Sequence, residues 1–302
     1  MDRERKKILP VVLNRGAGGG STQETVGELE RLFAASGLAA QVHVASGGPE
    51  LERLARELLG ESPAMLVAAG GDGTVSTLAS CLHGTGTVLA VLPMGTLNHF
   101  ARDIGIPMDL AQAVEVIARG APIGVDLCEV NGRHFVNNAS LGLYPDIVRD
   151  RTRQQRRLGR GKYWAMLWAT FAAMRRHAFL HLDMDIDGRQ VRCRAPFIFI
   201  GNNDYAMEGF AIGRRSSLRE GRMSVYTTRR RTRWGIVSLA MRALFGRLRQ
   251  ADDFSVEHAS RLRIDSHRPY LHIATDGEVW RAAVPLSIRT LPGALRVIAP
   301  AP

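Results

Sequence analysis

The chain has 302 residues, of which 45% are hydrophobic and 23% are charged, and its formal net charge is +11. This composition is typical of a folded globular protein of about two domains and excludes a disordered or fibrous chain. The positive charge favours an anionic partner, such as nucleic acid, anionic lipid or a phosphorylated substrate. Cys81, Cys128 and Cys193 form no zinc pattern and are expected to be reduced thiols.

The first 120 residues alternate between expected strands and expected helices. In chain order these are strand 8–13, helix 23–35, strand 41–44, helix 49–59, strand 65–69, helix 75–82, strand 88–92 and helix 110–118. Such alternation implies right-handed crossovers and a mostly parallel sheet. Ligands of such sheets bind at the carboxyl ends of the strands, where two glycine-rich stretches, residues 14–20 and 70–74, are expected to lie.

From about residue 123 the pattern becomes β-rich. Asn131-Gly132, Asp187-Gly188 and Asp276-Gly277 each separate two strand-like runs and predict tight hairpins. The expected strands are 125–130, 135–139, 180–186, 191–200, 271–275 and 279–288, and helices are expected near 162–177 and 234–248. We therefore predict an α/β domain over residues 1–122 and antiparallel sheets packed as a β-sandwich over residues 123–293.

The turn Gly70-Gly71-Asp72-Gly73-Thr74 is the most informative motif. Its glycines allow main-chain N–H groups to approach a ligand closely, and the following helix directs its positive end to the same place. Asp72 would repel a phosphate unless a cation or hydroxyl lies between them, so the turn indicates a nucleotide together with a metal ion. A plain strand-to-helix turn is the alternative interpretation.

A second motif, Pro93-Met94-Gly95-Thr96-Leu97-Asn98 with Phe100-Ala101-Arg102, follows the first at a fixed distance. Together the two motifs resemble the catalytic domain of the diacylglycerol kinase and sphingosine kinase family, most closely its bacterial lipid kinase branch. The resemblance continues through Asp126 and through residues 135–142, 201–202, 220–221 and 276–278, and so covers nearly the whole chain.

This resemblance implies ATP-dependent phosphorylation of the hydroxyl of a diacylglycerol-like or sphingoid lipid. It implies an α/β nucleotide-binding domain with a parallel sheet like that of phosphofructokinase and NAD kinase, and a β-sandwich substrate domain. The active site is expected in the cleft between them, and residues 294–302 are expected to return to the first domain.

The resemblance also implies site residues. Nucleotide-binding residues would be Asn14, Arg15, Gly16, Ala17, Gly18, Gly70, Gly71, Asp72, Gly73, Thr74, Val75, Ser76, Thr96 and Asn98. One carboxylate of Asp276 and Glu278 would act as general base, with Mg²⁺ and ATP at the reacting phosphate. A structural Mg²⁺ would bind at Ser217, Glu220 and Arg222. Taken without the resemblance, Asp276-Gly277 is also explained as a hairpin turn, and Thr96 and Asn98 as helix caps.

Several positions depart from the family pattern. His99 stands where Asp is usual, Ser76 where Asn is frequent, Arg15 where Pro is common and Glu220 where the metal-binding Asp is expected; the Thr frequent near residues 44–46 is absent. These departures keep a catalytically silent membrane-lipid-binding regulator as an alternative. An NAD kinase-like enzyme is another, because it shares the Gly-Gly-Asp-Gly-Thr turn, although the motif at residues 93–102 argues against it.

Two basic regions suggest a membrane contact. Residues 149–160 contain six arginines, residues 162–176 mix basic and aromatic side chains, and residues 229–234 repeat this pattern. We expect peripheral docking on an anionic membrane surface, at its cytoplasmic face and without a transmembrane helix. A solvated basic face is the alternative. No nucleic-acid-binding signature is present, and the sequence leaves a homodimer open.

Overall fold

The structure is a computed structural model that describes residues 8–17, 21–142, 179–206, 214–228 and 253–301. Gly18, the basic segments at 149–160, 162–176 and 229–234, and the helices expected near 162–177 and 234–248 lie outside these residues. The chain divides into two compact units. The first unit comprises residues 1–127 and 292–302, and the second comprises residues 128–291.

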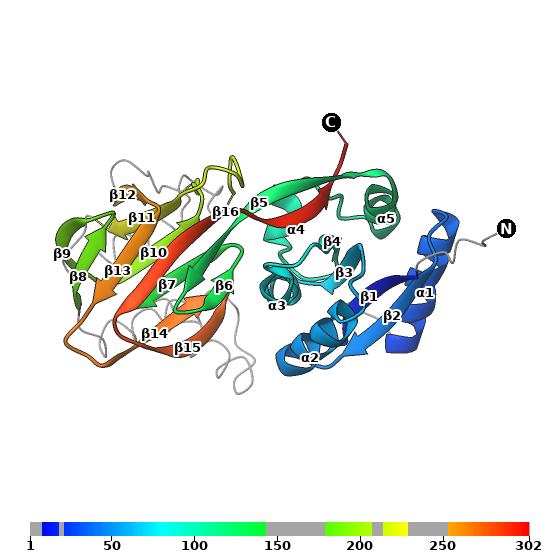
Figure 1. The fold of residues 1–302 in the computed structure, drawn as a ribbon, viewed down its shortest axis with the longest axis horizontal. Helices are drawn as coiled ribbons and strands as arrows, with labels where there is room; N and C mark the ends of the chain where they lie inside the picture. The colour runs from blue at the N-terminus through cyan, green and yellow to red at the C-terminus, as the bar shows by residue number, and fades with distance from the viewer. Residues whose placement is uncertain (1–7, 18–20, 143–178, 207–213, 229–252, 302) are drawn as a thin grey trace, which may run out of the picture. The chain divides into compact units, whose positions relative to one another are not determined.

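The first unit is built on a parallel sheet of four consecutive strands (Figure 1). These strands are β1 (Leu9–Asn14), β2 (Ala40–Ala45), β3 (Met65–Gly70) and β4 (Val88–Pro93), in the spatial order β2-β1-β3-β4. Beside β4 lies the end of β16 (Leu286–Ala299), where Val297 pairs with Leu89 in parallel register. Strands β1, β3 and β4 are short apolar runs buried on both faces, which is the pattern of a parallel sheet covered by helices, whereas β2 at the edge of the sheet is partly exposed.

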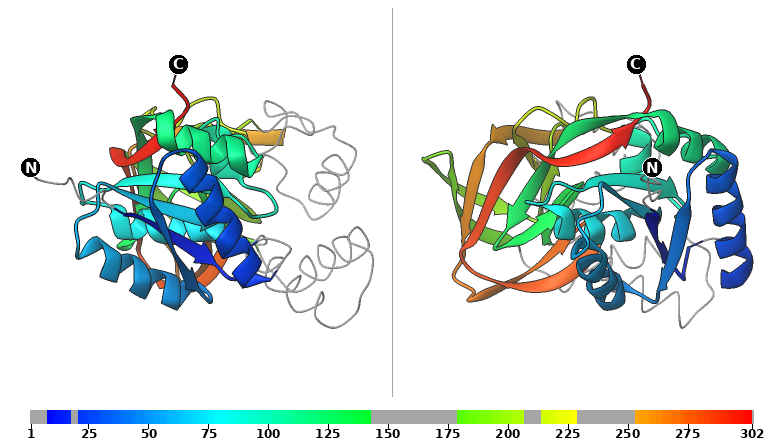
Figure 2. Two further views of the ribbon diagram at one scale, coloured as in Figure 1. Left: turned by 90° about the vertical axis from the view of Figure 1, so that its right-hand side faces the viewer. Right: turned by 45° about the vertical axis from the view of Figure 1, so that its right-hand side comes forward.

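Five helices accompany this sheet: α1 (Thr22–Ala35), α2 (Gly48–Leu59), α3 (Asp72–Leu82), α4 (His99–Asp103) and α5 (Leu110–Arg119). Helix α1 packs against α5 and α2 packs against α3, so helices cover both faces of the sheet (Figure 2). The prediction of an α/β domain is confirmed. Helix α3 begins three residues earlier than predicted, because its first turn is polar and the apolar spacing starts only at Val75.

The second unit contains two antiparallel sheets. Their strands are β6 (Arg133–Phe135), β7 (Asn138–Gly142), β8 (Leu180–Ile186), β9 (Arg189–Ala195), β10 (Phe197–Asn202), β11 (Met223–Thr228), β12 (Phe254–Ala259), β13 (Arg261–Asp265), β14 (Tyr270–Thr275) and β15 (Glu278–Ala283). One sheet has the order β12-β11-β10-β7-β14-β15, and the other contains β16-β13-β8-β9. Strand β5 (Ala121–Val130) pairs with β6 and β16. Side chains from both sheets form one buried core, so the predicted β-sandwich is confirmed.

The three predicted hairpins are present. They join β5 to β6, β8 to β9 and β14 to β15. Each has positive φ at both central residues: 48° and 84° at Asn131-Gly132, 48° and 91° at Asp187-Gly188, and 47° and 86° at Asp276-Gly277. This is the type I′ geometry that matches the twist of paired strands.

Three predicted strands were wrong because each is two strands. The run 191–200 divides at Pro196 into β9 and β10, and the run 279–288 divides before Leu286 at Pro285, because proline has no N–H to donate to a ladder. The run 135–139 divides between β6 and β7 at residues 136–137. Strands β11, β12 and β13 were not predicted.

Candidate active site

Three of the predicted loops lie side by side at the carboxyl edge of the first unit's sheet. Strands β1, β3 and β4 are neighbours, and they end at Asn14, Gly70 and Pro93. The register pairs Leu13 with Ala69 and Gly70 with Pro93, so the chain leaves all three strands at the same level. The loops beginning at these residues therefore share the edge where parallel sheets bind ligands.

Main-chain contact between two glycines holds the second and third loops together. A Cβ atom on Gly95 would lie 2.3 Å from the Cα of Gly71, and one on Gly71 would lie 3.1 Å from the Cα of Gly95. A Cβ on Gly70 would lie 2.3 Å from Oγ1 of Thr74. Only glycine permits this approach, which brings main-chain atoms of both loops to one place.

Side-chain hydrogen bonds fix the same loops. The Phe100 N–H donates to Asp72 Oδ1 (3.0 Å), which links the first motif to the second. Asn14 Nδ2 donates to Thr74 Oγ1 (3.1 Å), which links the first loop to α3. Asn98, at φ 50°, accepts a hydrogen bond from Gly95 N (2.9 Å) and donates one to Gly95 O (2.9 Å). The three loops thus form one rigid assembly.

The N-terminus of α3 lies within this assembly. The helix begins at Asp72, and its N-cap residue is Gly71, which has no side chain to cap the helix. An uncapped helix N-terminus next to glycine N–H groups is suited to bind phosphate, and Asp72 in its first turn is suited to hold a cation against that phosphate.

The remaining predicted nucleotide residues differ in exposure. Thr96 is exposed, whereas Val75 is 2% exposed, so only the main chain of Val75 is available to a ligand. Arg15 and Gly16 are exposed in the loop after β1, where the Gly16 N–H donates to Asn14 Oδ1 (3.3 Å). His99 is exposed at the start of α4.

Asp276 and Glu278 lie in the second unit at the β14–β15 hairpin, in contrasting environments. Asp276 Oδ2 accepts the N–H of Val136 (2.8 Å), and its Oδ1 accepts those of Asn137 (2.8 Å) and Asn138 (3.0 Å). The Glu278 side chain is 54% exposed and forms an ion pair with Arg133. Asp276 is therefore immobilised by main-chain donors, while Glu278 is accessible.

Arg133 was not predicted as part of this pair. It lies on β6, and its guanidinium is 5.3 Å from the ring centroid of Trp280 on β15. The contact joins hairpins that belong to different sheets and are distant in the sequence, and no local motif signals it.

Two of the three residues predicted for a structural Mg²⁺, Glu220 and Arg222, form ion pairs that also include Asp204. Glu220 Oε2 lies 3.1 Å from Arg222 Nε, and Arg222 Nη2 lies 3.1 Å from Asp204 Oδ2. The hydrogen bond to Glu220 raises the pKa of Arg222. Ser217 Oγ accepts the Arg219 N–H (3.1 Å). The Glu220 carboxylate is thus already paired with a guanidinium, which competes with a cation for it, and the structural Mg²⁺ stays a prediction.

His258 and Ser224 complete the cluster around Asp204. His258 Nε2 lies 2.8 Å from Asp204 Oδ1, and Ser224 donates its hydroxyl hydrogen bond to the same oxygen. Burial alone would raise the pKa of Asp204, but the bond from Ser224 and the neighbouring His258 and Arg222 hold it below its usual value.

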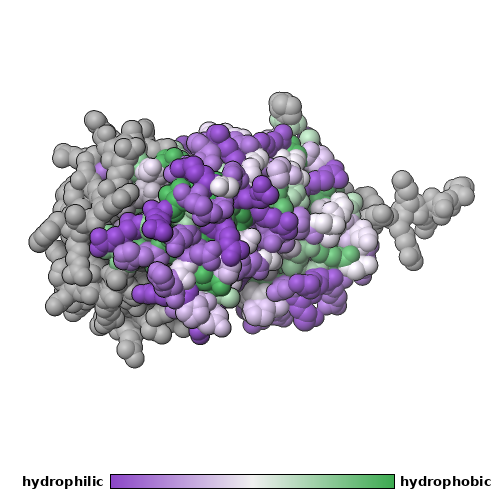
Figure 3. Space-filling view, turned by 60° about the vertical axis from the view of Figure 1, so that its left-hand side comes forward, coloured by the Kyte–Doolittle hydropathy of each residue, from purple (hydrophilic) through white to green (hydrophobic). Residues whose placement is uncertain are grey.

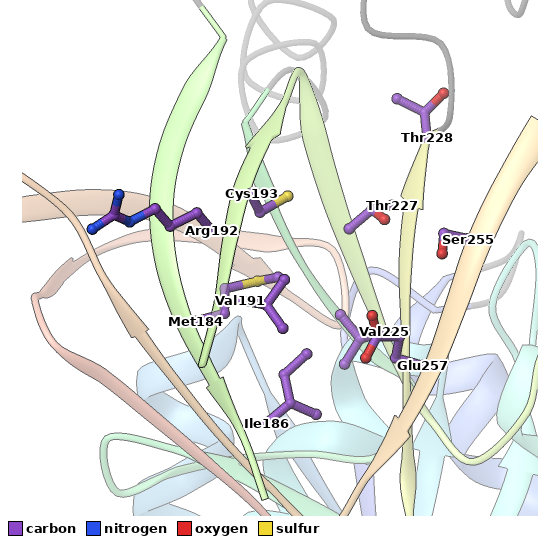
Figure 4. A pocket seen from close by; sticks show the side chains of 10 residues that line it. All are labelled: Met184, Ile186, Val191, Arg192, Cys193, Val225, Thr227, Thr228, Ser255 and Glu257. Carbon is purple, nitrogen blue, oxygen red and sulfur yellow. The ribbon is translucent and has the colours of Figure 1, made fainter. Parts of the chain in front are cut away.

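A pocket of about 430 Å³ opens in the second unit between strands of the two sheets (Figure 4). Its residues are Met184, Ile186, Val191, Arg192 and Cys193 of β8 and β9, Val225, Thr227 and Thr228 of β11, and Ser255 and Glu257 of β12. Glu257 also pairs with Arg189. The lining combines aliphatic side chains with hydroxyls, one thiol and two charged side chains, Arg192 and Glu257, which suits an amphiphilic molecule. Since β11 and β12 were not predicted, the sequence offered no signal for it.

The face of the molecule in Figure 3 is mainly hydrophilic where residues are described. In the face of Figure 3, hydrophobic residues occur in small separate patches. The exposed large hydrophobic side chains of the described residues are Ile8, Leu97, Met108 and Tyr270. No helix in the described part of the chain has the length and apolar character to cross a membrane.

Family models match both halves of the chain. Residues 9–130 match the diacylglycerol kinase catalytic domain, and residues 142–299 match the YegS C-terminal NAD kinase beta sandwich-like domain. In fold, the chain is similar to a diacylglycerol kinase structure from Bacillus anthracis str. Sterne, with a TM-score of 0.70, 18% identity and coverage of 98% of both chains.

Curated relatives match over shorter stretches. An uncharacterised protein of Synechocystis is 27% identical over 247 residues, which are 80% of this chain and 56% of that protein. A probable lipid kinase YegS-like protein of Pectobacterium atrosepticum is 28% identical over 173 residues, 56% of each chain. A diacylglycerol kinase of Staphylococcus carnosus is 36% identical over 94 residues, 30% of this chain and 31% of that protein. The matches thus span about half or less of these relatives.

More than half of the chain matches the second family model, over the β-sandwich described above. The chain therefore belongs to the family of the YegS C-terminal NAD kinase beta sandwich-like domain, preceded by a region that matches the diacylglycerol kinase catalytic domain.

Proposed function

We propose that this protein is an ATP-dependent lipid kinase that phosphorylates the hydroxyl of a diacylglycerol-like or sphingoid lipid. The observation that carries this proposal is the main-chain contact of Gly71 with Gly95 beside the uncapped N-terminus of α3, with Asp72 in the first helical turn. Relatives named diacylglycerol kinase and probable lipid kinase support the choice of lipid as the acceptor.

The nucleotide role belongs to the first unit. Glycine N–H groups and the N-terminal end of α3 would bind the phosphates of ATP, because both present positive partial charge to an anion. Asp72 would hold the Mg²⁺ that accompanies the nucleotide, which neutralises charge as the γ-phosphate is transferred. The hydrogen bond from Phe100 N holds the Asp72 carboxylate in place.

The general base belongs to the second unit, and we assign it to Glu278. Three main-chain N–H groups already donate to the two carboxylate oxygens of Asp276 and hold this side chain within the second unit. Glu278 is half-exposed on the adjacent strand, where a substrate hydroxyl can reach it. The lipid oxygen would attack the γ-phosphorus, its proton would pass to Glu278, and the bond to the leaving ADP would break.

We propose that the pocket between β8–β9 and β11–β12 binds part of the lipid that accepts the phosphate. Met184, Ile186 and Val225 supply aliphatic surface for hydrocarbon, while Thr227 and Ser255 supply hydroxyls. The net charge of +11 supports docking of the protein on an anionic membrane that contains the lipid.

A labelled-ATP assay against diacylglycerol, sphingosine and NAD tests the proposal, with Asp72→Asn and Glu278→Gln as variants. We expect label in a lipid for the unaltered protein and at least a hundredfold less for each variant. Label in NADP would favour the NAD kinase alternative. Binding to lipid vesicles without any transfer would favour the silent regulator.

A further inference from the structure

The segment Val136–Asn138 of the second unit lies between two charged side chains, Asp276 and Arg215. On its amide side, all three N–H groups donate to the carboxylate of Asp276, at 2.8, 2.8 and 3.0 Å. The main chain of Asp276 also returns to this segment, because its N–H donates to Asn138 O (2.9 Å). The position of the β14–β15 turn is therefore set by residues more than a hundred positions earlier in the sequence.

On the carbonyl side of the same segment lies Arg215. Its Nη1 donates to Val136 O (2.7 Å), and its Nη2 donates to the side-chain oxygen Oδ1 of Asn137 (2.8 Å). Asn202 supports these contacts, since its Nδ2 also donates to Val136 O (3.0 Å). One planar guanidinium thus holds two oxygens of consecutive residues, which a lysine ammonium does not reproduce.

The surroundings of Arg215 hold it in this orientation. The residue is 8% exposed, and its guanidinium lies 5.4 Å from the ring centroid of Tyr205. Tyr205 is 5% exposed and donates its hydroxyl hydrogen bond to Asn137 O (2.9 Å). A buried charge destabilises the folded protein unless it is hydrogen-bonded. The buried guanidinium of Arg215 therefore requires its hydrogen bonds to these oxygens.

A single peptide group connects the two charges. The Val136–Asn137 peptide accepts from Arg215 through its carbonyl and donates to Asp276 through its N–H. A cation at the oxygen end and an anion at the hydrogen end both polarise this peptide in the same direction, and hydrogen bonds in such a chain strengthen one another. The next peptide repeats the arrangement, with the Tyr205 hydroxyl at its carbonyl.

We propose that Arg215 is a positioning residue for the carboxylate pair, acting on Asp276 through the Val136–Asn137 peptide. Asp276 occupies the first central position of the turn, and Glu278 begins the strand that leaves it. By fixing Asp276, Arg215 fixes the turn that presents Glu278. This inference rests on the proposed function for its catalytic consequence. The clamp, by which we mean the hydrogen bonds that connect Arg215 to Asp276 through this peptide, is a structural claim that does not rest on that function.

The first test measures the clamp without any reference to activity. Amide hydrogen exchange of residues 136–138 is compared in the unaltered protein, Arg215→Lys, Arg215→Met and the control Arg263→Met. Arg263 is an exposed arginine of the same unit, paired with Asp265. We expect at least tenfold faster exchange in both Arg215 variants and no change in the control. Unchanged exchange in folded Arg215 variants would overturn the proposal, whether or not the protein is a kinase.

The second test is a double-mutant cycle on lipid phosphorylation. We expect Arg215→Met to lower kcat at least tenfold with KM for ATP within threefold, and Arg215→Lys to recover part of the loss. In an Asp276→Asn background, Arg215→Met should change kcat less than twofold, because the group through which it acts is already altered. Equal losses in both backgrounds would show that Arg215 does not act through Asp276.

Thermal unfolding separates these effects from loss of the fold. If Arg215→Met does not fold, Tyr205→Phe is tested in its place, because it removes the hydroxyl that donates to the neighbouring carbonyl of Asn137. We expect it to lower kcat two- to fivefold and to speed exchange at Asn138. No effect on either quantity would overturn the proposal. An unaltered protein that transfers no phosphate to lipid would refute the proposed function and leave the exchange test standing.

Discussion

The two units hold their key acidic residues in different ways. Asp72 is the first residue of α3, and Phe100, whose main-chain N–H donates to its carboxylate, is 28 residues away within the same pair of motifs. Asp276 is held by three donors about 140 residues away. The first arrangement is a local motif that glycines make possible, and the second is a product of sheet pairing. The sequence motif therefore locates the first carboxylate, whereas the contacts of the second carboxylate depend on the fold.

The largest expected effect distinguishes the two carboxylates of the second unit. Glu278→Gln should lower kcat by a factor of about 10² to 10⁴, the usual contribution of a general base, with little change in stability. Asp276→Asn should lower kcat and also destabilise the fold by about 2–4 kcal/mol, since it weakens three charge-assisted hydrogen bonds. Steady-state kinetics and urea unfolding of both variants check this. A Glu278→Gln enzyme with normal kcat would refute the assignment of the base.

A smaller effect is expected at the glycine contact of the first unit. Gly95→Ala places a Cβ 2.3 Å from main-chain Cα of Gly71, so the loops must separate. We expect at least tenfold weaker ATP binding by calorimetry and a loss of stability of about 1–3 kcal/mol. Gly86→Ala is the matched control, because its Cβ meets no atom within 4 Å. Equal ATP affinity in the two variants would contradict the proposed nucleotide site.

A substitution in the pocket of the second unit is expected to change the KM for lipid and not the KM for ATP. Val225→Trp should fill part of the pocket and raise the KM for lipid about tenfold, while the KM for ATP stays within twofold. This split is expected because the substitution lies in the second unit and the nucleotide loops lie in the first. A short-chain lipid should be affected less than a long-chain one. An unchanged KM for every lipid would exclude this pocket from substrate binding.

The smallest expected effect is on the stability of the fold, through the charge of Asp204. The pKa of Asp204 in the folded state lies below its ordinary value near 3.8, so its ionised form stabilises the fold above that pH. This contribution is lost as the pH falls through the lowered pKa. Asp204→Asn should therefore cost about 1 kcal/mol or less at pH 7, since solvent screens a partly exposed group, and less than that at pH 3, because the pH has then moved toward the lowered pKa. Urea unfolding at the two pH values measures the difference. A larger cost at the lower pH would reverse the sign of the argument.

Local patterns were sufficient for the first unit and for the hairpins. Apolar runs located β1, β3 and β4 to within one residue at either end, because a strand buried on both faces must be apolar throughout. Asn-Gly and Asp-Gly pairs located all three hairpins, because few residues tolerate positive φ at both central positions. Helix α4 escaped prediction, since five residues are too short for a periodic pattern.

Tertiary structure decided the roles of individual residues. Resemblance to the family predicted Asp276 and Glu278 as the two carboxylates of the site. Only the pairing of β14 with β7, however, brings the amides of Val136–Asn138 to Asp276. The ion pair of Arg222 with Asp204 and the burial of Arg215 likewise follow from packing between segments that are separated in the sequence. Sequence determines which backbone conformations are available locally, whereas the partners of a polar side chain are chosen by distant segments that folding brings together.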